Sequence, residues 1–89
     1  MKTITLKEAI DILSQCSAVI IDNVVTYPSL HEHEEFLNLS WTDGEYNDFN
    51  ESFYARDNEN VIIVDSSMFL VDESGDEVQL TILCPQKLD

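Results

Sequence analysis

The apolar residues of this chain stand in short, tight runs, and this feature constrains the fold most. Residues 19–21 and 61–64 consist entirely of Val and Ile, which favour β-strands. Such runs supply a hydrophobic core. We therefore interpret the chain as folded, although its net charge of −14 at pH 7 favours disorder. Its 89 residues have room for one small domain, residues 1–89.

The N-terminal segment predicts an amphipathic helix that buries one face. Thr5, followed three residues later by Glu8, predicts a capping box at the start of that helix. The apolar residues recur at i, i+3, i+4 and i+7 along one stripe: Leu6, Ala9, Ile10, Leu13 and Cys16.

The rest of the chain predicts about five strands in meander order. Strands are expected at residues 18–25, 36–41, 52–56 and 61–64, and residues 68–72 and 77–83 predict a hairpin. Residues 45–53 fit both a strand and a helical turn, and we favour a loop there. Short connections favour antiparallel pairing. The predicted fold class is therefore α+β, an N-terminal helix packed on a mostly antiparallel sheet of about five strands in a two-layer single domain.

The middle third of the chain, residues 31–60, is strongly acidic. It holds one basic residue, Arg56, against nine acids: Glu32, Glu34, Glu35, Asp43, Glu45, Asp48, Glu51, Asp57 and Glu59. Aromatic and aliphatic residues alternate with these acids, so we expect the carboxylates to be fixed on a folded surface. Carboxylates fixed this close together repel one another and destabilise the folded chain. A basic partner would relieve that repulsion.

The charge balance excludes several classes of partner. Four Lys and Arg residues against 18 acids cannot neutralise a nucleic-acid backbone, and they repel anionic membranes for the same reason. We see neither a membrane-spanning run nor the apolar stretch of a signal peptide, so the sequence predicts a cytosolic protein of its own cell or of a host. In a reducing compartment, Cys16 and Cys84 are interpreted as small buried hydrophobes rather than as a disulfide.

Catalytic and metal chemistry have weak support. His31 and His33 would point to one side of an extended segment and could join Glu34 or Glu35 around a metal ion, but no third histidine accompanies them. We interpret that segment as an exposed loop. No serine or cysteine stands in the setting of a nucleophile. The sequence therefore predicts neither an enzyme nor a cofactor.

Two roles remain for the acidic surface, solubility alone or the binding of a partner. We favour binding, because a net charge of magnitude about 2–8 suffices for solubility in a small domain and this chain carries −14. Acids two residues apart on one strand, such as Asp43 with Glu45 or Asp57 with Glu59, would lie about 6.5 Å apart and could replace neighbouring phosphates. Tyr46 and Phe49 would add aromatic anchors. The predicted contact residues are Glu32, Glu34, Glu35, Asp43, Glu45, Asp48, Glu51, Asp57 and Glu59, with Tyr46 and Phe49.

The leading hypothesis is a non-enzymatic inhibitor that occupies the basic surface of a nucleic-acid-processing enzyme. In size and charge, though in no motif, the chain resembles small phage inhibitors that imitate the nucleic-acid backbone, such as anti-restriction proteins, anti-CRISPR proteins and glycosylase inhibitors. One alternative is an assembly module that uses a sheet edge and aromatic residues. A less favoured alternative is a small metal-binding protein that uses His31 and His33. The sequence leaves the oligomeric state open.

Overall fold

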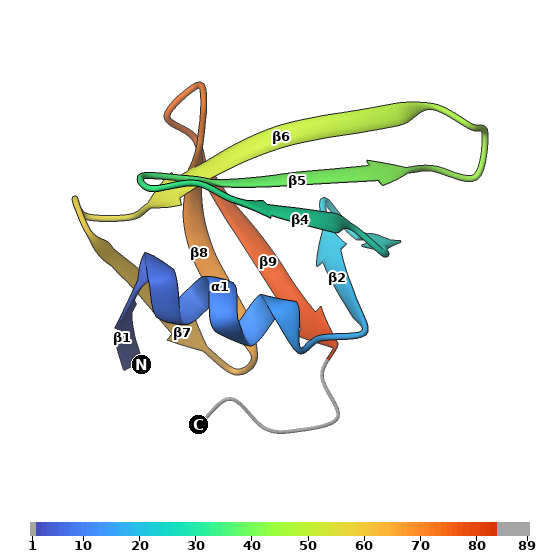
Figure 1. The fold of residues 1–89 in the computed structure, drawn as a ribbon. Coiled ribbons are helices and arrows are strands. Elements are labelled where there is room, and N and C mark those ends of the chain that lie inside the picture. The colour runs from blue at the N-terminus through green and yellow to red at the C-terminus, as the bar shows by residue number, and fades with distance from the viewer. Residues whose placement is uncertain (1, 84–89) are drawn as a thin grey trace.

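The computed structural model describes residues 2–83, which form one helix and nine strands in one antiparallel sheet (Figure 1). The elements are β1 (Lys2–Thr5), α1 (Leu6–Ser14), β2 (Ala18–Ile21), β3 (Val24–Thr26), β4 (Ser29–Glu32), β5 (Leu37–Thr42), β6 (Asp48–Ala55), β7 (Asn60–Val64), β8 (Ser67–Asp72) and β9 (Glu77–Leu83). The predicted helix on a five-stranded sheet is therefore wrong. The sheet dominates the fold and has almost twice the expected number of strands.

The sheet forks along strand β8. The main path runs β3-β2-β9-β8-β6-β5-β4, and β7 pairs with β8 and β1 off this path. Residues 62–64 of β7 pair with residues 67–69, and residues 53–55 of β6 pair with residues 70–72. Both strands therefore use the same edge of β8 in succession. The fork carries β6, β5 and β4 away from β7 and β1, and helix α1 crosses below this upper layer (Figure 1).

The core lies between the inward faces of the forked sheet and the helix. Its largest fully buried side chains are Phe53, Leu37, Leu39, Met68, Leu70, Leu80 and Val61. Leu37 and Phe53 are direct cross-strand partners on β5 and β6, so the upper layer is anchored by a buried pair. Burial of these side chains supplies the main driving force for folding.

The N-terminal helix and its cap are confirmed. The Thr5 side chain accepts from the Glu8 N–H at 3.1 Å, and the Glu8 carboxylate accepts from the Thr5 N–H at 3.4 Å. Ala9, Ile10 and Leu13 are buried in the core, as their spacing predicts. The β8–β9 hairpin and the strand at 61–64 are also confirmed, the latter as β7.

Two tight hairpins have residues with positive φ at their turns, and one of them accounts for a missed strand. The predicted strand at 18–25 is instead β2 and β3, joined by Asp22 and Asn23 with φ of 50° and 65°. Asp65 and Ser66, with φ of 48° and 66°, join β7 to β8 in the same way. Positive φ at both central residues gives a turn whose twist matches that of the flanking strands. Short polar residues adopt it at low cost.

Three further predictions are corrected. Residues 29–32, expected as a loop, form edge strand β4, and residues 48–55, expected partly as a loop, form strand β6. Cys16 packs against the core and is disulfide-bonded, so the interpretation of a reduced thiol is wrong for this residue. Cys84 lies outside the described residues. No helix in the described range is long and apolar enough to cross a membrane.

Candidate functional site: the projecting β5–β6 hairpin

The β5–β6 hairpin extends beyond the body of the protein (Figure 1). Strand β5 pairs with β4 only as far as Ser40, and β6 pairs with β8 only from Phe53 onward. Within the hairpin, residues 50–52 still pair with residues 38–40, so residues 41–49 alone pair only with one another, and we call them the projecting hairpin. This segment contains three acids, Asp43, Glu45 and Asp48, and no basic residue.

Cross-strand contacts between side chains hold the projecting hairpin together. The rings of Trp41 and Phe49 stack with centroids 5.6 Å apart and an interplanar angle of 12°. The Thr42 hydroxyl donates to the Asp48 carboxylate at 3.0 Å. A two-stranded ribbon alone is marginal in water, and an aromatic cross-strand pair is one of the contacts that stabilise it.

Asp43 builds the loop at the end of the hairpin, residues 43–47, which we call the tip loop. Its carboxylate accepts from the main-chain N–H groups of Glu45, at 2.8 Å, and Asn47, at 2.9 Å, and from the Asn47 side-chain amide at 3.1 Å. The main-chain and side-chain hydrogen bonds from Asn47, with that from Glu45, hold the pKa of the Asp43 carboxyl below its ordinary value. Asp43 is therefore a loop-forming residue first, whereas the sequence predicted a partner contact.

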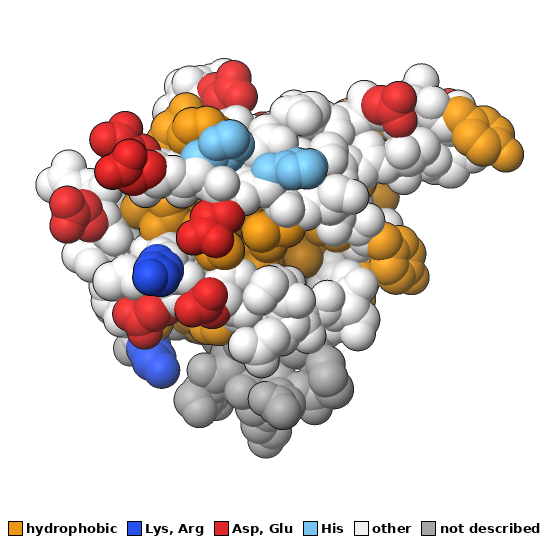
Figure 2. Space-filling view, viewed as in Figure 1, with side chains coloured by type: hydrophobic (Ala, Val, Ile, Leu, Met, Phe, Trp, Pro, Cys, Tyr) orange, Lys and Arg blue, Asp and Glu red, His pale blue; other side chains and the backbone are white. Residues whose placement is uncertain are grey.

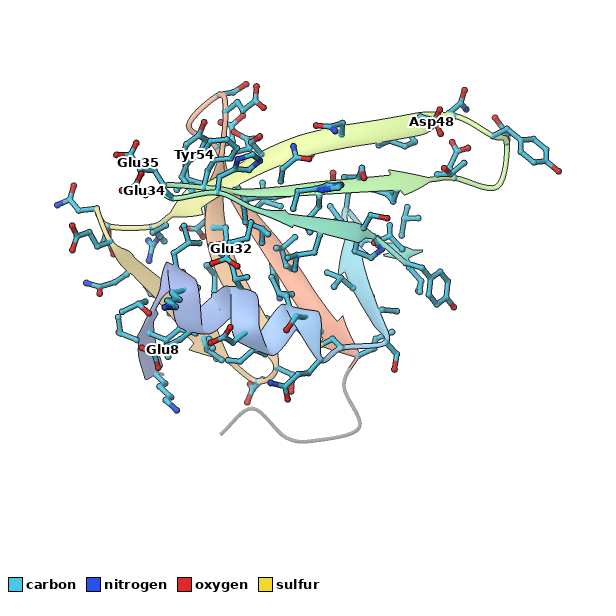
Figure 3. The ribbon with its side chains drawn as sticks, viewed as in Figure 1. Glu8, Glu32, Glu34, Glu35, Asp48 and Tyr54 are labelled. Atoms are coloured by element: carbon cyan, nitrogen blue, oxygen red, sulfur yellow. The ribbon has the colours of Figure 1, made fainter. Side chains whose placement is uncertain are left out.

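The other predicted residues of the hairpin remain accessible to a partner. Glu45 and Asp48 are exposed, Phe49 is 43% exposed and Tyr46, at the apex, is 90% exposed. Figure 2 shows apolar side chain at the far end of the projection, and Figure 3 places Asp48 beside it. The tip thus combines two carboxylates with two aromatic faces.

Three predicted acids gather at the opposite end of the molecule. Glu34, Glu35 and Glu59 line a groove of about 480 Å³ together with Thr5, Leu6, Tyr54, Ala55 and Asn58. We call this the acidic groove. Figure 3 shows Glu34, Glu35 and Tyr54 at this end, far from Asp48, and Figure 2 shows several carboxylates over the same region. Acids that are close together in the sequence are therefore divided between two separate places on the molecule.

Glu32 and Glu51 lie on the face of the upper layer that also carries buried leucines, although Glu32 is exposed and Glu51 is half-buried. Glu32 is the cross-strand partner of Leu37, and Glu51 is the partner of Leu39, and both leucines are buried. Partial burial raises the pKa of the Glu51 carboxyl, and the nearby carboxylates of Asp72, Asp22 and Glu73 raise it further. We therefore leave Glu51 out of the candidate contact surface.

The predicted spacing of acids along single strands is wrong. Asp43 and Glu45 lie in the tip loop, and Asp57 and Glu59 lie in the turn between β6 and β7, where Asp57 has a φ of 51°. Arg56, beside that turn, is already paired with the Glu77 carboxylate at 2.5 Å. None of the predicted acid pairs therefore lies on one strand at the interval of successive phosphates. Any likeness to nucleic acid has to come from the shape and charge of the whole surface.

The two histidines lie in different surroundings in the described part of the chain. His31 lies on the exposed edge strand β4, and the His33 ring stacks on Phe36 with centroids 4.2 Å apart. Phe36 in turn contacts Tyr54, at 5.6 Å between centroids. Within residues 2–83, no group of three or more His, Cys, Asp or Glu side chains is placed to hold a metal ion.

One apolar edge was not predicted as a surface. Strand β3 pairs with β2 alone and ends the sheet, and Val24 and Val25 on it are 52% and 49% exposed. Tyr27 follows the strand and is also exposed. Recognising this edge from the sequence requires reading Asp22 and Asn23 as a hairpin turn.

Comparisons with known proteins identify no matching family, no similar curated protein and no similar solved structure.

Proposed function

We propose that the protein is a small, non-enzymatic inhibitor that binds the basic surface of a nucleic-acid-processing enzyme through its projecting hairpin. The observation that carries this proposal is the ribbon of residues 41–49, which has three acids, no base and an exposed aromatic apex. A channel that accommodates nucleic acid is basic and narrow, so a thin acidic projection complements it in both charge and width.

The mode of contact differs from a copied row of phosphates. The outward side chains near the middle of β5 and β6 are polar and uncharged, and Asn38 there donates to Asn50 at 2.7 Å. Of the predicted contact acids, Asp43, Glu45 and Asp48 lie at the tip of the hairpin, and Glu34, Glu35 and Glu59 line the acidic groove. Insertion of the tip therefore fits the surface better than a flat contact along the upper layer.

We place this activity in the cytosol, of the protein's own cell or of a host cell. A disulfide at Cys16 is uncommon in that compartment. Because the projecting hairpin is built without Cys16, the inhibition is expected to be the same with and without a thiol reductant.

The test uses three purified enzymes, a nuclease, a uracil-DNA glycosylase and a CRISPR effector, each assayed on DNA with increasing amounts of the protein. The proposal expects inhibition of at least one of them that competes with DNA and weakens steeply as salt rises. An unchanged rate for every enzyme at low salt contradicts it, and so does inhibition that is insensitive to salt.

A second candidate function is assembly with another chain through the apolar β3 edge. The exposed Val24 and Val25 favour it, because an open strand edge with apolar side chains is a site of strand addition. A Val25→Lys variant is expected to abolish such an assembly in sedimentation experiments and to leave inhibition intact. If the wild-type protein and the Val25→Lys variant both sediment as monomers, this candidate function is removed.

A further inference from the structure

Two hairpin loops of this protein share one hydrogen-bonding design. In the tip loop, the Asp43 N–H donates to the Asn47 carbonyl at 3.0 Å, and the Tyr46 N–H donates to the Asp43 carbonyl at 3.3 Å. In the β8–β9 loop, the same bonds join Asp72 to Asp76, at 2.9 Å, and Gly75 to Asp72, at 3.0 Å. Each first aspartate also accepts from the main chain two and four residues later.

The two loops differ in the residue at the left-handed position. Gly75 has a φ of 87°, as is usual for this loop type, whereas the equivalent Tyr46 has a φ of 64°. Among residues 2–83, every other non-glycine residue with positive φ is Asp, Asn or Ser. The tip loop does contain a glycine, Gly44, but at a position where φ is not positive.

The left-handed conformation is unfavourable for a tyrosine, and packing of the Tyr46 side chain does not offset its energetic cost. Non-glycine residues lose stability there because Cβ approaches the following carbonyl oxygen. Tyr46 is 90% exposed, so its ring gains almost no burial within the protein. Strained residues that gain nothing in the free protein are typical of contact sites.

We propose that Tyr46 is the anchor of the projecting hairpin and that it receives an arginine side chain of the partner. This inference rests on the proposed function and names the partner chemistry at its tip. The guanidinium group of arginine stacks flat on an aromatic ring and also pairs with a carboxylate in two-pronged geometry. Glu45, next to Tyr46, and Asp48, across the loop, supply exposed carboxylates for that pairing.

Arginine and lysine are distinguishable at such a site. Both are attracted by the charge of the hairpin, but lysine carries a compact, strongly hydrated ammonium that stacks less well on a ring. The acidic groove, by comparison, has Tyr54 in its wall but no aromatic side chain at an exposed apex. The preference for arginine should therefore depend on Tyr46 and not on the acids alone.

The test measures binding of an arginine homopeptide and a lysine homopeptide of equal length by calorimetry at low salt. Wild-type protein is expected to bind the arginine peptide about fivefold more tightly than the lysine peptide, the size of an exposed cation–π contact. Tyr46→Phe keeps the ring and should keep this preference. Tyr46→Leu keeps an apolar side chain, Tyr46→Gly removes the side chain, and both should lose most of the preference for the arginine peptide.

The outcomes separate this inference from the proposed function. Equal binding of the two peptides by the wild-type protein, or a preference that is undiminished in Tyr46→Leu and Tyr46→Gly, overturns the role of Tyr46. It leaves a hairpin that binds basic surfaces by charge. Binding of neither peptide by the wild-type protein overturns both proposals.

Discussion

The rings of Trp41 and Phe49 stack across β5 and β6 at the point where the hairpin leaves the rest of the sheet, with centroids 5.6 Å apart. Ser40, one residue before Trp41, is the last residue of β5 that pairs with β4. The stacked pair therefore begins the part of the hairpin that has no neighbouring strand, and Trp41 also packs against the core. It sets how rigidly the tip is presented.

Removal of this pair should loosen the hairpin without unfolding the domain. Trp41→Ala is expected to lower the local stability of residues 42–49 by about 1 kcal/mol beyond the loss of buried area, the usual contribution of an aromatic pair. Hydrogen exchange of the main-chain amides measures this directly. Tyr27→Ala removes an exposed ring outside the hairpin and should leave the same amides protected. Equal loss of protection in both variants contradicts the role of the pair.

Exchange of the residues at the two left-handed positions should change stability in opposite directions. Tyr46→Gly is expected to stabilise the protein by about 1 kcal/mol, and Gly75→Tyr to destabilise it by about 1–2 kcal/mol, because only the tyrosine is strained at positive φ. Urea unfolding of the two variants gives both values. A destabilised Tyr46→Gly variant shows instead that the ring has a structural role.

Glu51 should reduce stability at neutral pH. Its folded-state pKa is raised by partial burial and by the carboxylates of Asp72, Asp22 and Glu73. The contribution of Glu51 to the free energy of unfolding is therefore fully present below its ordinary pKa of 4.5. It is lost as the pH rises through the raised pKa of the folded state. Glu51→Gln is expected to be more stable than wild type at pH 7 and equal to it at a pH below 4.5.

The control for this prediction is Glu59→Gln, which makes the same change in charge at an exposed position. Thermal unfolding of all three proteins across the pH range provides the comparison. If Glu59→Gln stabilises the protein as much as Glu51→Gln does, the effect comes from net charge and not from the surroundings of Glu51.

Asp43 has the opposite dependence on pH. Its folded-state pKa is lowered by hydrogen bonds from Asn47 and Glu45, so its contribution is present above the ordinary value of 3.8 and is lost as the pH falls through the lowered pKa. We expect the amide of Asn47 to lose protection from hydrogen exchange in that acidic range. Asp43→Asn removes the titrating group, and the protection of Asn47 in that variant should then be independent of pH there.

Parts of the fold could be predicted because a local pattern determines them. The capping box of Thr5 and Glu8, and the alternation in β8 and β9, both depend on residues a few positions apart. The β2–β3 hairpin was missed because Asp22 and Asn23 interrupt an apolar run without a glycine. Only the C-terminal part of strand β6 was predicted, because the apolar residues of segment 45–53 fit both the spacing of a strand and that of a helical turn.

The candidate site was less predictable than the fold for a tertiary reason. The acids were identified from composition, but their grouping depends on where β5 and β6 lose their neighbours. Glu34 and Asp48 are only 14 residues apart in the sequence, yet they lie at opposite ends of the upper layer (Figure 3). Asp43 was predicted only as a partner contact. Its structural role, accepting hydrogen bonds from Glu45 and Asn47, depends on a loop type that the sequence does not reveal.

The most direct test of the central claim compares two double variants that each remove two negative charges. Glu45→Gln/Asp48→Asn changes the tip of the projecting hairpin, and Glu34→Gln/Glu35→Gln changes the acidic groove. We measure the Kd of each for an enzyme that the wild-type protein inhibits. The account predicts a loss of about tenfold or more for the tip variant, since close charge pairs contribute at least 1.5 kcal/mol, and a much smaller loss for the groove variant. Equal losses in the two variants, or a larger loss at the groove, would contradict binding through the hairpin.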